Sequence, residues 1–428
     1  MKPRFRKSTI AALDIGSSKV CCFIAKVDDM GRARVLGIGH QISAGMKAGV
    51  VMNVEAVENS ILNAVHAAEQ MAGGDTIRSV YVNVSCGHPA SQHFDVELPL
   101  HGQQVRDLDV QKLLGQCRVA YDQQMNQSTG ANDNSMNRYL LHAIPVGYSL
   151  DGSRGIRDPR GMYGQRLGAS VHLVSAQNGA LRNLATCVER CHLDLDGFVL
   201  SPYASGLATL VEDEMDLGCT LIDMGGGTTS VAVFFDGNLL FSDIVPIGGM
   251  HVTNDIARGL STPVLQAERL KTLYGGALAT AQDDEDMIDV PLVGENDLND
   301  APNHIPKSYL NRIIQPRLEE TFEAVRAKLA EANVDKIAGR RVVLTGGASQ
   351  LSNVRELAAN ILDKQVRLGK PIRLTGLADA AGGPAFSTCA GLLTFATHQE
   401  AQVEGKKPST GKGQSLWSQV KSWIEETL

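Results

Sequence analysis

The chain has 428 residues, of which 43% are hydrophobic and 20% are charged, and its formal net charge is −7. This length exceeds what one hydrophobic core usually organises, so more than one domain is expected. The acidic balance argues against a nucleic-acid-binding protein, no apolar run reaches the roughly 18–20 residues of a transmembrane helix, and no signal-peptide core follows the basic start.

Eight cysteines are scattered along the chain without a CxxC pair. Most lie in apolar stretches, as Cys21 and Cys22 do. Cys187 and Cys191 are four residues apart on a predicted helix. Buried thiols explain this pattern better than a metal site or disulfides, so the sequence predicts a cytosolic protein.

The chain begins with short apolar runs separated by glycine-containing turns. Residues 9–27 read TIAALDIGSSKVCCFIAKV, and another apolar run follows. Runs rich in valine, isoleucine and phenylalanine that end at glycine are typical of β-strands. Asp14 lies just before the first turn. That turn consists of Gly16, Ser17, Ser18 and Lys19.

The same order of elements returns near the middle of the chain. Residues 219–235 read CTLIDMGGGTTSVAVFF, with Asp223 in the place of Asp14. A repeat at roughly half the chain length predicts two lobes of similar fold that face each other. The second turn consists of Gly225, Gly226, Gly227, Thr228 and Thr229.

The two turns together predict a polyphosphate site. Small residues let backbone N–H groups approach an anion closely, the hydroxyl groups of the turns add donors, and Lys19 adds a positive charge. The aspartates Asp14 and Asp223 would hold a hydrated Mg²⁺, which prefers oxygen ligands. Two ordinary glycine hairpins are the alternative, but the matched aspartates favour the phosphate site.

Two further segments fit a nucleotide. Residues 266–275 predict a helix on which Glu268 and Lys271 share one face, although a solvated ion pair is the commoner reason for that spacing. Residues 340–354, RRVVLTGGASQLSNV, predict a buried strand, a tight turn and the start of a helix, whose free N–H groups admit a base or a phosphate. This third turn contains Gly346, Gly347 and Ala348.

The end of the chain, SLWSQVKSWIEETL, contains both tryptophans. Its spacing predicts an amphipathic helix, which is too short to be stable alone and needs a surface to bury its apolar face. Tryptophan suits a membrane interface; a groove on a partner and docking onto the chain itself are the alternatives. The apolar face consists of Leu416, Trp417, Val420, Trp423, Ile424 and Leu428.

These segments together resemble the actin-like ATPase superfamily, which includes actin, MreB, the large heat-shock chaperones and the sugar kinases. LDIGSSK and LIDMGGGTTSVAVF resemble its phosphate motifs, AERLK its ribose-contacting helix, and VVLTGGASQL its adenosine motif. Residues 194–210 resemble the segment that connects its two lobes. The resemblance implies an α/β fold of two lobes, each with a ribonuclease-H-like core, that binds ATP and Mg²⁺.

Within the superfamily, the chain resembles the bacterial cell-division FtsA family. VLSPYASGLATL, VPIGGMHVTNDIA and RDPRGMYGQRLGASVHLV read like that family, as does the tail. The resemblance implies an inserted subdomain, IC, in place of the usual IB. The implied units are residues 1–84 (IA), 85–164 (IC), 165–198 (IA), 199–240 (IIA), 241–317 (IIB), 318–397 (IIA), 398–414 (flexible linker) and 415–428 (membrane-targeting helix).

This resemblance also implies a function. FtsA proteins self-assemble, anchor filaments of the tubulin-like FtsZ to the cytoplasmic face of the inner membrane at the septum, and recruit later division proteins. Subdomain IIB binds a C-terminal FtsZ peptide in that family, although a solvated helix face also explains the basic residues here. A pilus-assembly scaffold of the PilM type and a sugar kinase are the alternative functions. The candidate peptide-binding residues are Lys307, Arg312 and Arg317.

The connecting segment lacks a residue that superfamily ATPases use. A Glu or Gln there orients the water that attacks the γ-phosphate. Depending on the alignment, that position falls on Ser201 or Gly197, and neither side chain can polarise water. Asp194 and Asp196 are nearby but displaced. The sequence therefore predicts tight nucleotide binding with weak or no ATP turnover.

Overall fold

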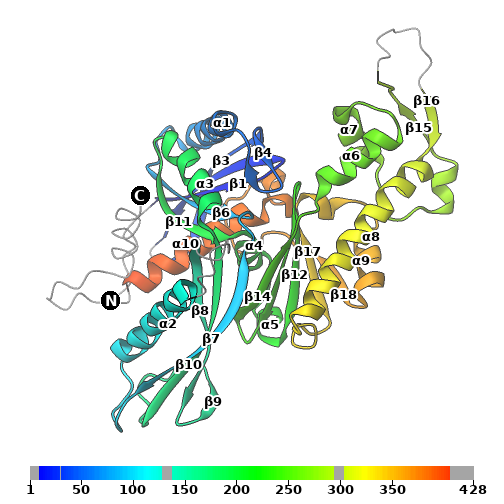
Figure 1. Ribbon diagram of the computed structural model, residues 1–428. Helices are drawn as coiled ribbons and strands as arrows, with labels where there is room; N and C mark the ends of the chain where they lie inside the picture. Colours follow the sequence, from blue (N-terminus) through cyan, green and yellow to red (C-terminus); the bar gives the residue numbers. More distant parts are fainter. Residues whose placement is uncertain (1–8, 29, 128–136, 294–302, 405–428) are drawn as a thin grey trace.

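The computed structural model describes residues 9–28, 30–127, 137–293 and 303–404. They form two sheet-centred lobes and two smaller units (Figure 1). The tail helix predicted at residues 415–428 lies outside these ranges, as does most of its linker. Helix α10 (Ser387–Glu404) continues into the region where the linker was predicted to start. Within the described ranges, every helix is too short or too polar to cross a bilayer.

The first lobe is a mixed sheet in the order β11-β6-β1-β2-β3. β1, β2 and β3 form the predicted antiparallel meander, β6 runs parallel to β1, and β11 runs parallel to β6. Helices α1 (Val54–Ala72) and α3 (Asn178–Arg190) bury their apolar stripes against one face. The strands are β1 (Thr9–Ile15), β2 (Lys19–Val27), β3 (Ala33–Ile42), β6 (Ser79–Val84) and β11 (Asp194–Leu200).

The second lobe repeats this topology in the order β14-β13-β12-β17-β18. β12, β13 and β14 form the antiparallel meander, and β17 and β18 continue the sheet in parallel. Its strands are β12 (Cys219–Met224), β13 (Thr229–Phe235), β14 (Asn238–Val245), β17 (Arg341–Thr345) and β18 (Gln365–Leu368). The predicted pair of similar lobes is therefore confirmed.

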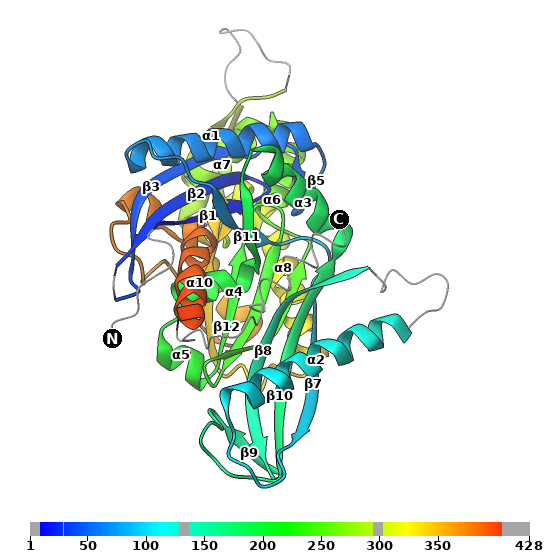
Figure 2. The same ribbon diagram turned by 90° about the vertical axis from the view of Figure 1, so that its left-hand side faces the viewer.

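Helices α4 (Ser201–Thr209) and α10 lie between the two sheets, as Figure 2 shows. They share one apolar core with both lobes, to which the first lobe contributes Phe23 and the second Phe234. The helices cross so closely that a Cβ on Gly391 would lie 1.8 Å from the carbonyl oxygen of Ala204. Only glycine fits this crossing, which holds the two lobes together.

The insert after β6 is a sheet in the order β7-β10-β8-β9 with helix α2 on one face. β10 pairs with both β7 and β8, so the sheet extends to Gln177, beyond the expected boundary at residue 164. Two short strands precede α1. The elements are β4 (Met46–Lys47), β5 (Val50–Val51), β7 (Ala90–Pro99), α2 (Asp107–Gln127), β8 (Arg138–Leu150), β9 (Ser153–Ile156) and β10 (Arg166–Gln177).

The insert also docks on strand β14 of the second lobe. His172 contacts the carbonyl oxygen of Leu239 at 2.9 Å through Nδ1, and His93 contacts that of Leu240 at 2.8 Å. The two imidazole rings stack with centroids 5.0 Å apart. Arg157 forms an ion pair with Asp236. The insert, which belongs to the chain of the first lobe, therefore also contacts the second lobe.

The remaining elements of the second lobe surround its sheet and extend above it (Figure 1). Helix α8 continues well past residue 317, where a subdomain boundary was expected. The elements are α5 (Glu212–Leu217), α6 (Gly249–Gly259), α7 (Val264–Tyr274), β15 (Met287–Val290), β16 (Asn303–Pro306), α8 (Lys307–Glu331) and α9 (Val354–Leu362).

Candidate functional site

The two predicted glycine turns have the same local geometry. In the first, the N–H of Gly16 donates to the carbonyl oxygen of Lys19 at 2.9 Å, and in the second the N–H of Gly225 donates to that of Thr228 at 2.9 Å. Each turn joins the first two strands of a meander, so the two turns lie at equivalent strand ends of their sheets. The repeat seen in the sequence is therefore a repeat of structure.

These turns meet across the space between the lobes. A Cβ on Gly227 would lie 2.4 Å from Ser17 Oγ, and one on Gly226 would lie 2.7 Å from Ser18 Oγ. Ser17 Oγ also accepts a hydrogen bond of 2.9 Å from the N–H of Gly49. Because a side chain on either glycine would collide with the opposite turn, the close approach depends on glycine.

The two aspartates are buried beside these turns. Burial raises the pKa of Asp14 to about 6, with Lys19 opposing the shift and Asp223 adding to it. Burial also raises the pKa of Asp223, against hydrogen bonds from Ser205 and Thr388 and the charge of Lys19. Two carboxylates taken out of water near each other favour a cation between them.

Lys19 is the basic group of the site and is engaged by the second lobe. Its Nζ donates to the carbonyl oxygen of Ala385 and lies 3.8 Å from the centre of the Phe386 ring. Both partners come from a short 3₁₀ segment, Pro384–Phe386. A phosphate group would have to compete with these contacts for the lysine.

The cavity between the turns has a volume of about 110 Å³. The cavity lies where the three predicted turns approach one another. The predicted residues that line it are Asp14, Gly16, Ser17, Ser18, Lys19, Asp223, Gly225, Gly226, Gly227, Thr228, Gly346 and Gly347. Thr229 is absent from this lining: its hydroxyl donates to the carbonyl oxygen of Ile247 at 2.8 Å.

Sequence reasoning missed several polar residues of this cavity. Asn83, at the end of β6, accepts a hydrogen bond of 2.7 Å from the N–H of Ile15 and donates to Ser201 Oγ at 3.2 Å. Asn83 could have been found from the sequence, because it is a polar residue within an otherwise apolar strand. Ser201, discussed above only as a substitute for a water-orienting residue, lines the cavity too. The other missed polar residues are Ser85, Ser230 and Thr388, and the apolar Ala385 lines the cavity as well.

The third predicted turn lies at the same cavity, with one difference from expectation. After β17, Gly346 takes a φ of 87°, and a Cβ there would lie 2.4 Å from Asp223 Oδ1. The predicted strand, turn and helix start all lie within residues 340–354, but a 3₁₀ segment, Gly347–Gln350, stands between the turn and α9, which begins at Val354.

The predicted helical pair lies beside this turn. Lys271 Nζ contacts Glu268 Oε2 at 2.6 Å, and both contact the hydroxyl of Thr253. A Cβ on Gly249 would lie 3.3 Å from the Cβ of Ala348 and 3.6 Å from Lys271 Nζ. The shared helical face is confirmed, and α7 and the third turn meet at the start of α6.

The basic residues of α8 are all engaged within the chain. Lys307 contacts Asp283 at 2.8 Å, Arg312 lies 3.8 Å from Asp284, and Arg317 contacts Asp255 at 2.6 Å. Against the effect of burial, hydrogen bonds from Lys307 and Thr280 lower the pKa of Asp283 to about 2. Each of these three side chains therefore contacts a carboxylate outside α8, and only Arg317 also forms an i,i+3 pair, with Glu320. A peptide would have to exchange these contacts.

The site fits a magnesium nucleotide by its chemistry. It combines two buried carboxylates, a lysine, the hydroxyl groups of Ser17 and Thr228, and glycines whose backbones approach where side chains cannot. Such an arrangement suits an anion held by backbone N–H groups and a cation held by carboxylate oxygens. The residues of this cavity are acidic only at Asp14 and Asp223.

Comparison with known proteins places these features in a family. The family model for the cell division protein FtsA matches residues 220–391, and the model for the SHS2 domain inserted in FtsA matches residues 86–175, which ends within β10. FtsA of Rhizobium meliloti is 43% identical, with 100% of this chain and 96% of that protein covered. FtsA of Escherichia coli K12 is 32% identical, with 98% of each covered.

Solved structures share the fold. A PilM–PilN type IV pilus biogenesis complex matches with a TM-score of 0.64 and 16% identity, covering 92% of this chain and 99% of that one. MreB 5 of Spiroplasma citri bound to AMPPNP matches with a TM-score of 0.54 and 12% identity, covering 94% and 99%. These likenesses show an actin-like ATPase fold. The full-length identity goes further: this chain belongs to the FtsA family of cell division proteins.

Proposed function

We propose that this chain is a nucleotide-binding membrane tether of the bacterial division apparatus. It binds ATP and Mg²⁺ between its lobes, self-assembles, links FtsZ filaments to the cytoplasmic face of the inner membrane at the septum, and recruits later division proteins. The observation that carries the proposal is the pair of facing glycine turns with their buried aspartates, in a chain of the FtsA family. The shared fold with MreB 5 bound to AMPPNP supports it.

The described residues divide the work of binding. Lys19 and the N–H groups of both turns would hold the phosphates, and Asp14 and Asp223 would hold Mg²⁺ through its waters. The ion would neutralise part of the phosphate charge. The third turn and the Glu268–Lys271 pair would contact the adenosine. Slow turnover is part of the proposal, because the cavity lining includes Ser201 and Asn83, whose neutral side chains cannot act as a general base.

The membrane tether is proposed from the sequence of residues 415–428. Full burial of one large apolar side chain contributes ~1.5–3 kcal/mol, part of which is lost to ordering the helix. One tail should therefore bind weakly and reversibly. Many tails on one polymer would bind firmly through their effective concentration, which is why self-assembly belongs to the same proposal.

A liposome experiment tests the tether. Full-length Trp417→Glu and Trp423→Glu variants should sediment with liposomes at least about tenfold less than the wild type, because a carboxylate replaces the buried ring. Ser418→Glu, on the polar face, is the matched control and should sediment normally. Binding of the tryptophan variants at the wild-type level would refute the tether, provided that all variants bind ATP equally.

The proposed FtsZ-peptide site is helix α8 with Lys307, Arg312 and Arg317. An acidic peptide would replace the intrachain carboxylates that these side chains contact. Arg312 offers the easiest exchange, since its contact is long, at 3.8 Å, and its side chain is 67% exposed. Arg317 is held more firmly, between Asp255 and Glu320.

A scaffold for a membrane assembly machine is the second candidate function. The observation that favours it is the fold shared with the PilM–PilN complex, at a TM-score of 0.64. Such a scaffold would reach the membrane through a membrane protein rather than through its own tail. Deletion of residues 405–428, which leaves α10 complete, would leave membrane recruitment intact in that case, and would abolish it if the chain is a tether.

A further inference from the structure

Asp223 receives two hydroxyl donors on a single oxygen. Ser205 Oγ donates to Asp223 Oδ2 at 2.6 Å, and Thr388 Oγ1 donates to the same oxygen at 3.1 Å. The two hydroxyl oxygens are themselves 3.0 Å apart. Asp14 has no comparable pair of side-chain donors among the hydrogen bonds of the described residues.

This arrangement fixes which carboxylate oxygen is available. Oδ2 accepts both hydrogen bonds, which leaves Oδ1 as the other carboxylate oxygen. Oδ1 lies beside Gly346, where an added Cβ would lie 2.4 Å from it. A carboxylate with one oxygen held by neutral donors keeps its charge but loses rotational freedom. Such a group is preorganised to accept a water or an ion at the free oxygen.

The two donors come from the two helices that join the lobes. Ser205 lies on α4 and Thr388 lies at the start of α10. Ser205 is completely buried, so it has no water to exchange with. The hydroxyl pair therefore links the helix crossing to the second lobe's aspartate.

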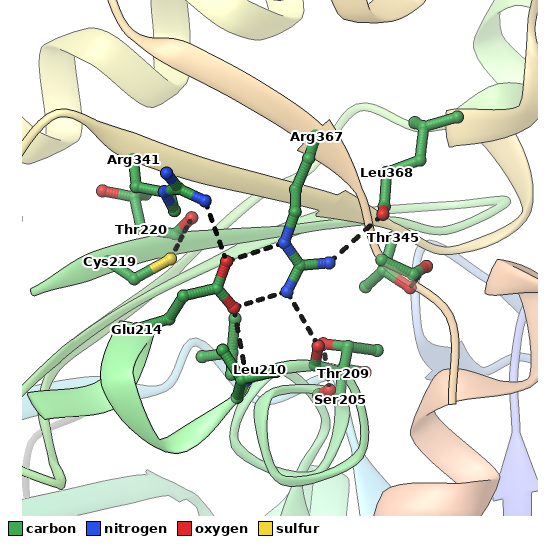
Figure 3. A network of polar contacts seen from close by, with 12 residues as sticks. Ser205, Thr209, Leu210, Glu214, Cys219, Thr220, Arg341, Thr345, Arg367 and Leu368 are labelled. Carbon is green, nitrogen blue, oxygen red and sulfur yellow. Dashed lines mark hydrogen bonds and ion pairs between the residues drawn. The ribbon is translucent and has the colours of Figure 1, made fainter. Parts of the chain in front are cut away.

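A polar network fixes α4 independently of Asp223 (Figure 3). Thr209 donates to the carbonyl oxygen of Ser205 at 2.7 Å, and Arg367 Nη2 donates to the carbonyl oxygen of Thr209 at 3.0 Å. Arg367 in turn makes paired contacts of 2.7 and 2.5 Å with Glu214. Because the helix end is capped in this way, Ser205 presents its hydroxyl from a rigid element.

We propose that Ser205 and Thr388 are positioning residues that orient Asp223 for the Mg²⁺ of a bound nucleotide. The inference rests on the proposed nucleotide site and adds two residues to it. They act through Asp223 and do not touch the ion. They should therefore affect the affinity for ATP only when Mg²⁺ is present.

Titration of the full-length protein with ATP, with Mg²⁺ and with EDTA, tests this role. Ser205→Ala and Thr388→Val should weaken Mg²⁺-ATP binding about tenfold or more, as expected for loss of a hydrogen bond to a charged group. The affinity for ATP in EDTA should change less than twofold. Thr388→Ser keeps the hydroxyl, so Mg²⁺ should increase its affinity for ATP by the same factor as in the wild type.

Thr394→Val is the matched control on α10. It removes a buried hydroxyl that donates to the carbonyl oxygen of Ala390 at 3.1 Å and does not contact Asp223, and it should leave the Mg²⁺ effect unchanged. If Ser205→Ala does not fold, the Thr388→Val and Thr388→Ser pair decides alone. Equal losses with Mg²⁺ and EDTA, or a loss in Thr388→Ser equal to that in Thr388→Val, would overturn the inference. A wild type that binds no ATP would overturn the proposed site and this role with it.

Discussion

His172 is kept neutral by its surroundings. Burial lowers its pKa to about 3, with the stacked His93 contributing, and burial lowers that of His142 to about 4. His142 accepts a hydrogen bond of 3.0 Å from the N–H of Leu200, which requires an unprotonated nitrogen. Both rings gain a proton more readily in the unfolded chain, where a histidine has a pKa near 6.5.

The free energy of unfolding should therefore fall as the pH falls below about 6.5. For each buried histidine, the free energy of unfolding falls by about 1.4 kcal/mol between pH 7.5 and 5.5, because the unfolded state takes up the proton first. The raised pKa of Asp14 has the opposite sign and offsets part of this loss. Urea unfolding of His172→Gln should therefore show about 1.4 kcal/mol less loss over this range than the wild type.

The exposed His66 is the control for this measurement. His66→Gln should follow the wild type at both pH values. If His172→Gln retains the full pH dependence of the wild type, burial does not keep His172 neutral in the folded protein.

Single residues of the site differ in how far the sequence could predict them. Asp14, Asp223 and the glycines belong to local strand-turn-strand patterns, which short segments encode. Thr388 and Ser205 reach Asp223 from helices that are distant in the chain, so no spacing links them. The contacts of Lys307 with Asp283 and of Arg317 with Asp255 likewise depend on how separate segments pack.

The crossing of α4 and α10 is the tightest contact between the elements that join the lobes. Gly391→Ala should lower the free energy of unfolding by at least ~2 kcal/mol, because the new Cβ would meet a backbone oxygen that cannot rotate away. Gly115→Ala, in helix α2, is the control. Nothing lies within 4 Å of a Cβ there, so that change should stabilise the protein by ~0.5–1 kcal/mol.

Chemical denaturation of both variants measures this difference. The two alanine substitutions should move the unfolding midpoint in opposite directions. A Gly391→Ala protein as stable as the wild type would show that α10 can shift away from α4 at little cost.

Strands and helices with strong local patterns could be predicted from the sequence. Their boundaries depend on contacts with segments that are distant in the chain. The meanders of both lobes follow from glycine turns between apolar runs. The insert extends to Gln177 because β10 pairs with β7 and β8, and its pairing with β7 joins residues 67 to 85 positions apart. Helix α8 continues past residue 317 because its apolar face, with Leu318, Phe322 and Val325, stays buried against the second lobe.

In the whole molecule, the two lobes are linked across the candidate site. Lys19 reaches over the cavity to the carbonyl oxygen of Ala385. The insert contacts the second lobe through His93, His172 and Arg157. Any movement of the lobes relative to each other must therefore strain or release these contacts of the insert.

Calorimetric titration of the full-length protein with Mg²⁺-ATP examines the facing turns most directly. The wild type should bind one nucleotide per chain, and Gly227→Val should bind at least about tenfold more weakly, because its side chain would occupy the space beside Ser17. Gly147→Val, at a strand glycine with open space around it, should bind like the wild type. Absence of binding in the wild type, or equal binding by Gly227→Val, would contradict a nucleotide held between the two turns.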